Sequence, residues 1–397
     1  MPLWSQCLLN SCIPVELGCE DHAASRHRPS ATIAIGSRAH VDYLDWFRAV
    51  AILIIIAGHS YPLCGEDVVY QGDHIAGRLA NAIPALLTGG TAYFVFISGF
   101  LYRLVFFGRT TYGEFMRKKA LFVGLPYLIL ASPIALLEIG LGASTVVSSP
   151  SGFIYPHSSF VDFIALISTG RVITAYWYIP FIFIIFLASP LFDRFIALSR
   201  AWSSLVFLLS IGIAFWVVRP AGNLNPVHSF LYFANFYLLG ILFCEHREAI
   251  ISLVTRPLVI ATLLLGIFAI GAVQALVMER VGNLERNPTD GWGLVGIDLM
   301  LVQKCVGVFL LCAMLSRWGA PLARPFEFIA GISFGLFFVH GIVIAILLRL
   351  PLAASLRVGE PLVDLTMQST VVFLLSVLIV VAVRRVAGRA SRFVIGC

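Results

Sequence analysis

An arginine and a histidine share one face of the first apolar segment, YLDWFRAVAILIIIAGHSY. Arg48 and His59 are eleven residues apart, a spacing that returns to the same side of a helix after three turns, with an axial rise of about 16 Å. Histidine titrates near neutral pH and can take a proton from a hydroxyl, whereas arginine stays charged and can hold a phosphate or a carbonyl oxygen. The pair therefore suits acyl transfer, with His59 as the general base.

Asp45 precedes Arg48 by three residues and can pair with its guanidinium group on the helix surface. An ionisable group inside a membrane span costs about 2.5–3.5 kcal/mol, so such groups indicate function. Alternatively, Asp45 and Arg48 mark the cytosolic interface and His59 is an interfacial histidine with a backbone partner. The alignment of Arg48 and His59 on one face favours the functional interpretation.

Other polar side chains interrupt the apolar segments and are weaker candidates. Ser98 in GGTAYFVFISGFLYR equally permits close helix packing, and Trp177 equally suits an aromatic belt at the outer interface. His340 falls near the middle of FEFIAGISFGLFFVHGIVI, where a purely structural histidine is costly. Asp298 and Lys304 are lesser candidates, for an internal ion pair.

Three consecutive basic residues lie at the cytosolic mouth of the expected third helix, in EFMRKKALFVGLPY. Arg117, Lys118 and Lys119 can attract the phosphates of a nucleotide-like donor. They are equally what the orientation of a membrane protein requires of a cytosolic loop. The sequence leaves both interpretations open.

The elements that must position these residues are membrane-spanning helices. Of the 397 residues, 59% are hydrophobic and 12% charged, against about 25% charged in an ordinary soluble domain. Apolar runs of the roughly 20 residues needed to cross a bilayer recur along the chain, and a barrel would alternate apolar and polar residues instead. The prediction is an all-α, polytopic membrane helix bundle of about ten spans, near 43–62, 82–107, 120–141, 173–192, 204–219, 228–244, 257–278, 293–316, 326–348 and 364–383.

The distribution of lysine and arginine predicts that both termini are cytosolic. With the N-terminal tail inside, inner segments hold 18 of these residues and outer segments hold seven, in accord with the positive-inside rule. Residues 1–42 then form a cytosolic tail, 43–385 the membrane domain and 386–397 a short basic cytosolic tail. This topology explains the net charge of +6 without a nucleic-acid partner.

The eight cysteines include no C-x-x-C pair. They are expected to be free thiols or small apolar residues, and neither a zinc site nor a disulfide framework is predicted. No other metal site is expected.

Five segments, in order, resemble signatures of the acyltransferase 3 family of integral-membrane acyltransferases, over residues 43 to about 385. Two departures stand out: Lys119-Ala120-Leu121-Phe122 replaces the second arginine of an Arg-x-x-Arg pattern, and Phe replaces Tyr at 334 and 337. The matching segments are Leu44-Asp45-Trp46-Phe47-Arg48 through His59, Tyr93 to Phe100, Arg117-Lys118-Lys119 with Pro126, Trp177-Tyr178-Ile179-Pro180, and Ile332 to His340.

The resemblance implies transfer of an acyl group, commonly acetyl, from a cytosolic coenzyme A thioester to a hydroxyl of a glycan, lipid-linked sugar or small molecule. Acetyl-CoA or another acyl-CoA would be a substrate, with no permanently bound cofactor, and the enzyme would be a multi-pass protein of the cell (inner or plasma) membrane. His59 would remove the acceptor proton while Arg48, braced by Asp45, positions the donor. The cavity would be lined by Tyr93, Ser98, Trp177 and His340.

A transporter or flippase for a glycosylated or acylated small molecule is the alternative, with Arg48, Lys304 and His340 as substrate or proton sites. Many transporters carry inverted repeats with paired broken helices, and neither is visible in this sequence. The polar residues also concentrate in the first, second and ninth helices instead of recurring in two halves. Acyl transfer is therefore the preferred interpretation.

Overall fold

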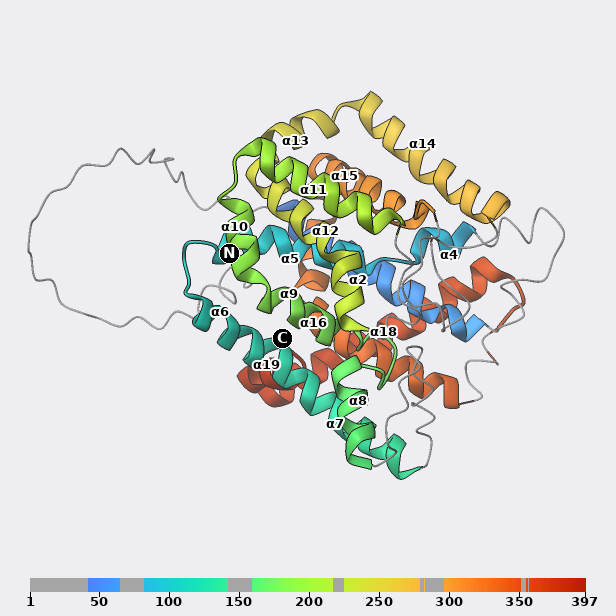
Figure 1. Cartoon of the computed structure of the whole chain (residues 1–397). Coiled ribbons are helices and arrows are strands. Elements are labelled where there is room, and N and C mark those ends of the chain that lie inside the picture. Colours follow the sequence, from blue (N-terminus) through green and yellow to red (C-terminus); the bar gives the residue numbers. More distant parts are fainter. Residues whose placement is uncertain are drawn as a thin grey trace, which may run out of the picture.

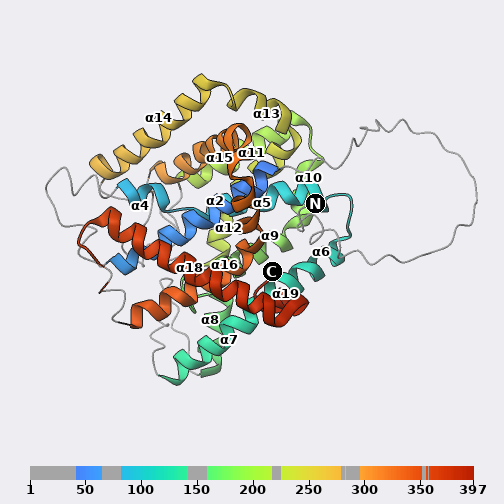
Figure 2. The same cartoon turned by 180° about the vertical axis from the view of Figure 1, so that it is seen from behind.

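The structure is a computed structural model that describes residues 42–64, 82–141, 159–216, 225–278, 282, 296–350, 355 and 357–397. Within these ranges every regular element is a helix (Figures 1 and 2). The predicted all-α bundle is therefore confirmed. The predicted cytosolic tail, apart from Asp42, lies outside the described residues.

The described elements follow one another along the chain as helices and short helical turns. Three of them, η3, η4 and η6, are π-helical, a geometry that often occurs near functional sites. The elements are α2 (Asp42–Ser60), η1 (Tyr61–Cys64), α4 (Ala82–Leu87), α5 (Thr91–Leu101), η3 (Tyr102–Phe106), α6 (Tyr112–Lys119), η4 (Ala120–Gly124), α7 (Leu125–Gly140), α8 (Ser159–Thr169), α9 (Tyr178–Leu187), α10 (Ser189–Ile196), α11 (Arg200–Trp216), α12 (Pro226–Glu245), α13 (Arg247–Val254), α14 (Pro257–Val273), η6 (Gln274–Met278), α15 (Leu299–Trp318), η7 (Ala320–Leu322), α16 (Ala323–Arg349), α18 (Pro361–Ala387), η8 (Gly388–Ala390) and α19 (Ser391–Val394).

Among the described residues, eight helical stretches are long and apolar enough to cross a membrane, and α9 with α10 adds a ninth if the 53° bend between them lies within one span. The segment α11 is apolar but shorter, so the expected count of about ten is not confirmed. The eight stretches are Asp42–Cys64, Ala85–Phe106, Tyr112–Gly140, Pro226–Glu245, Pro257–Val277, Leu299–Trp318, Ala320–Arg349 and Leu362–Val394.

The helix α2 lies in the middle of the bundle in both views (Figures 1 and 2) and packs against α16, α18, α15 and α5. Its inner face is mostly apolar, with Phe47, Ala51, Ile52 and Ile56 almost inaccessible to solvent. Burial in protein rather than lipid gives the polar residues on α2 a fixed environment. Trp46 near its start lies against Gly319 at the end of α15, which fixes the ends of the two helices together.

The closest helix crossing joins α5 to α12. A methyl group on Gly99 would collide with the carbonyl oxygen of Tyr237, and one on Gly240 would collide with the carbonyl oxygen of Phe96. Small residues at membrane helix crossings allow the backbones to touch in this way. Gly99, next to Ser98, therefore has a packing role at this crossing.

The turn between α8 and α9 enters the bundle instead of running over its surface. The Tyr176 hydroxyl donates to the Phe338 carbonyl oxygen on α16 at 3.0 Å, and Gly341 faces the carbonyl oxygen of Thr174. Ala175 is buried with a φ of 73°, a left-handed conformation that L-residues other than glycine rarely adopt. Such strained positions cluster at functional sites, and this one lies beside the pocket described next.

Candidate active site

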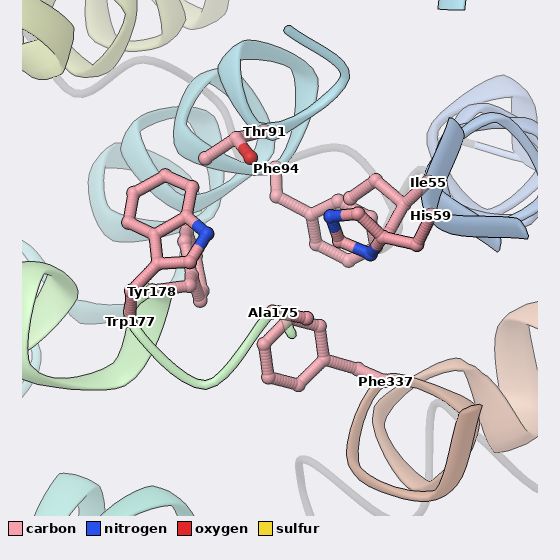
Figure 3. Close-up of a pocket in the computed structure, with 8 residues that line it drawn as sticks. All are labelled: Ile55, His59, Thr91, Phe94, Ala175, Trp177, Tyr178 and Phe337. Atoms are coloured by element: carbon pink, nitrogen blue, oxygen red, sulfur yellow. The ribbon is translucent and has the colours of Figure 1, made fainter. Parts of the chain in front are cut away.

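His59 lies near the end of α2 and lines a small pocket that side chains from four parts of the bundle enclose (Figure 3). Figure 3 shows His59 and Trp177 facing each other from opposite sides, with Thr91 and Phe337 on the remaining sides. The eight lining residues are Ile55, His59, Thr91, Phe94, Ala175, Trp177, Tyr178 and Phe337. They come from α2, α5, α16 and the turn into α9.

The walls of this pocket are mostly aromatic. Phe94 and Phe337 both pack edge-on against Tyr178, with ring centroids 6.5 and 5.4 Å apart. Among these eight described residues, His59 is the one histidine. Walls of this kind exclude water, which strengthens polar interactions inside the pocket and suppresses side reactions with water.

His340 on α16 contacts His59. The Nδ1 atom of His59 lies 3.0 Å from Nε2 of His340, and Nδ1 of His340 lies 2.9 Å from the Leu336 carbonyl oxygen. His340 is completely buried and does not line the pocket itself. The structure thus joins two histidines that are 281 residues apart in the chain.

Arg48 and Asp45 form the expected ion pair one turn apart on α2. Both side chains are partly buried, at 17% and 20% exposure. Nε of Arg48 is buried and has no hydrogen-bond partner among the described residues, so this donor remains for a bound group. Arg48 is three turns from His59 and outside the pocket.

The three consecutive basic residues have separate surroundings. Lys118 pairs with Glu114 one turn earlier, at 2.8 Å, and Arg117 is exposed. The ammonium of Lys119 turns toward the bundle and lies 4.8, 5.3 and 4.6 Å from the ring centroids of Phe106, Phe115 and Phe186. Cation–π contacts at these distances are attractive, so Lys119 is held by aromatic rings from three elements.

Tyr93 and Ser98, which the sequence places in the same cavity, lie outside the pocket. Tyr93 packs edge-on against Phe47, and its ring faces the Lys304 ammonium at 5.8 Å. Ser98 donates to the Phe94 carbonyl oxygen at 2.8 Å, as hydroxyls in membrane helices commonly do. Of the four expected lining residues, Trp177 therefore lines the pocket. His340 does not line it but contacts His59, which does.

Lys304 and Asp298 both satisfy helix ends. Lys304 donates to the Leu86 carbonyl oxygen at 2.5 Å, where α4 breaks before α5. Asp298 is the N-cap of α15 and accepts from the Met300 and Leu301 amides at 3.0 and 3.1 Å. The Lys304 contact stabilises the break between α4 and α5, directly before Thr91.

Several lining residues carry no signal in the sequence that would single them out. Ala175 reaches the pocket through its unusual φ, and Thr91 through the break at Gly89, whose φ is 84°. Phe337 occupies a position where the resembling motif has a tyrosine, and this departure is a usable signal. In the described part of the chain, no group of three metal-ligating side chains occurs, and five cysteines are free.

Comparison with known families decides the class. A family model described as an acyltransferase domain matches residues 41–385. The protein belongs to the acyltransferase 3 family. Comparisons with curated proteins and with solved structures gave no match to the chain.

In this membrane acyltransferase, the matched region runs from the start of α2 into the last turns of α18. It includes the pocket, the Arg48–Asp45 pair and the contact between His59 and His340. The aligned arginine and histidine that the sequence singles out thus lie on the central helix of an acyltransferase domain.

Proposed function

We propose that this acyltransferase moves a short acyl group, acetyl in the first instance, from a coenzyme A thioester to a hydroxyl of a glycan, lipid-linked sugar or small molecule. The observation that carries the proposal is the position of His59, an imidazole in an aromatic, water-excluding pocket. General bases need a pKa near the working pH and access to the proton they remove. His59 supplies an imidazole, the side chain most often used as a general base, and it lines the pocket.

In the proposed reaction His59 takes the acceptor's hydroxyl proton as the oxygen attacks the thioester carbonyl carbon. The tetrahedral adduct then collapses by breaking the carbon–sulfur bond. The proton on His59 passes to the leaving thiolate, so that an ester and free coenzyme A result and His59 is regenerated. In acyl transfer the same side chain commonly acts first as general base and then as general acid.

Arg48 is the proposed anchor for the donor. Its buried Nε lacks a partner among the described residues, and arginine binds phosphate oxygens with directed hydrogen bonds. The three helical turns between Arg48 and His59, about 16 Å along the axis, suit the long pantetheine arm that separates the phosphates of coenzyme A from its thioester. Asp45 keeps the guanidinium group oriented.

Donor delivery from the cytosol follows from the distribution of charge. The helices α6, α10 and α19 lie on the same side of the molecule in both overall views (Figures 1 and 2), and they carry Arg117, Arg194 and Arg392. The positive-inside rule assigns such a basic side to the cytosol. We place the protein in the cell membrane with this side facing the cytosol and the His59 pocket toward the opposite face.

The proposal is tested by incubating membranes that contain the protein with acetyl-CoA labelled in the acetyl group. We expect label in a hydroxyl-bearing acceptor, as an alkali-labile ester, with the wild type and with the matched control His246→Ala. His246 lies between α12 and α13 and does not line the pocket. Normal labelling by folded His59→Ala, or movement of substrate across vesicles without covalent label, contradicts the proposal.

A further inference from the structure

The contact between His59 and His340 has a defined direction, because His340 also contacts a carbonyl oxygen. A carbonyl oxygen only accepts hydrogen bonds, so Nδ1 of His340, 2.9 Å from the Leu336 oxygen, must carry the hydrogen. In neutral imidazole the other nitrogen then holds a lone pair. The Nε2 atom of His340 is therefore an acceptor.

This acceptor sets the protonation of His59 in turn. Nδ1 of His59 lies 3.0 Å from Nε2 of His340, so it is Nδ1 of His59 that carries the hydrogen and donates. The lone pair of neutral His59 is then on Nε2. The tautomer of a histidine is commonly set by the hydrogen bond at its other nitrogen, and here that bond comes from a second histidine.

The ring geometry supports a linear hydrogen bond. The planes of the two rings differ by 5° and their centroids are 5.3 Å apart. That separation equals the 3.0 Å between the nitrogens plus about one ring radius on each side, so the rings meet edge to edge and not face to face. Linear N–H···N geometry is the strongest arrangement.

His340 is itself held in place. It is completely buried, its Leu336 partner is one turn earlier on α16, and the neighbouring Phe338 carbonyl oxygen accepts from Tyr176. The same turn carries Ala175 and Trp177 into the pocket. The pocket wall and the orientation of His340 therefore depend on one another.

We propose that His340 is a positioning residue: it fixes His59 in the tautomer with its lone pair on Nε2 and fixes the angle of the ring. This inference rests on the proposed role of His59 as general base. When His59 takes the acceptor proton at Nε2, both of its nitrogens carry hydrogens. Nδ1–H still donates to His340, which stabilises the cation until the proton passes to the thiolate. Other enzymes use a carboxylate in this position; here the neutral acceptor adds no charge to an apolar region.

Two amide substitutions at position 340 separate the contact with His59 from the contact with Leu336. The amide of His340→Gln reaches the former Nε2 position, where its oxygen can accept from His59. The shorter amide of His340→Asn reaches only the Nδ1 position beside Leu336. The apolar His340→Leu lacks both contacts, and the three variants are assayed together with His59→Ala and the double variant His59→Ala/His340→Leu.

We expect His340→Leu and His340→Asn to lower the rate of acetyl transfer at saturating acetyl-CoA roughly 10²-fold or more, by analogy with loss of the residue that orients a catalytic histidine. His340→Gln should recover to within about 10-fold of wild type. The acetyl-CoA concentration for half-maximal rate should change little in all three. The double variant should be no slower than His59→Ala, because residues that act as a unit are not additive.

Rates for His340→Asn that equal those of His340→Gln overturn the inference, since they show that reach to His59 does not matter. Additive losses in the double variant overturn it as well. Should His340→Leu not fold, the Asn and Gln pair still decides between the outcomes. Full activity of folded His59→Ala would instead refute the proposed function, so the two failures are distinguishable.

Discussion

The pocket around His59 and the opposite, basic end of the bundle hold their polar groups in different ways. In the pocket, two histidines contact one another among aromatic walls, with no lysine or arginine among the described lining residues. At the basic end, Arg103 pairs with Glu245 at 3.0 Å and Arg317 donates to the Thr255 carbonyl oxygen at 2.8 Å. The arginines at the basic end thus have partners, whereas the pocket lining contains no lysine or arginine among the described residues.

In the proposed function, the two ends of α2 therefore have different tasks: donor binding at Arg48 and proton transfer at His59. A fixed positive charge near the pocket would disfavour a positive charge on His59, whereas an arginine at the basic end can bind donor phosphates. Arg48 and His59 lie three turns apart on α2, so that the donor-binding charge is kept away from the pocket. Substitutions should therefore separate donor binding from chemistry.

The largest effect on stability is expected at the α5–α12 crossing, which lies between the two regions. Gly99→Ala adds a methyl group against the Tyr237 backbone, and overpacking of this kind costs about 1–3 kcal/mol. A lower midpoint of thermal unfolding in detergent is the expected result. The matched control is Gly212→Ala on α11, where a methyl group meets nothing within 4 Å; equal midpoints for both variants would show that the close crossing is dispensable.

Arg48→Ala tests the donor end alone. Loss of charge-assisted hydrogen bonds to phosphate should raise the acetyl-CoA concentration for half-maximal transfer about 10- to 100-fold. The rate with S-acetyl-pantetheine, which lacks the nucleotide phosphates, should change much less. An equal loss with both donors would place Arg48 in the chemistry and remove the division along α2.

Phe337→Ala tests the pocket alone. Removing this aromatic wall should let longer acyl groups enter, because a hydrophobic pocket discriminates one methylene by about 10- to 200-fold. Competition between acetyl-CoA and butyryl-CoA is the measurement, with Phe337→Tyr as the size-matched control. An unchanged preference in Phe337→Ala would mean that the acyl group binds elsewhere.

Lys118→Ala should have the smallest effect. The Lys118–Glu114 pair lies at the surface, with side chains 19% and 41% exposed, and such pairs contribute about 0–1 kcal/mol. We expect transfer rates within about twofold of wild type in the same labelling assay. A loss as large as that of Arg48→Ala would show that the donor site extends over the consecutive basic residues.

The helix class, the position of eight of the ten expected spans and the placement of Arg48 and His59 on one helix could be predicted, because they depend on apolar run length and helical period. The bend between α9 and α10 and the short α11 reduce the number of confirmed spans, and apolar composition alone does not reveal such breaks. The contact between His59 and His340 links distant segments, so spacing within one helix could not predict it. Nor could it predict that Tyr93 packs beside Lys304, outside the pocket.

Donor binding and acetyl transfer measured together for folded His59→Ala test the central claim most directly. The purified variant should bind acetyl-CoA with the affinity of the wild type, because Arg48 and the basic end are unchanged. Its transfer rate should fall by about 10²- to 10⁴-fold, the usual contribution of general acid–base catalysis. Wild-type transfer by this variant would contradict the account.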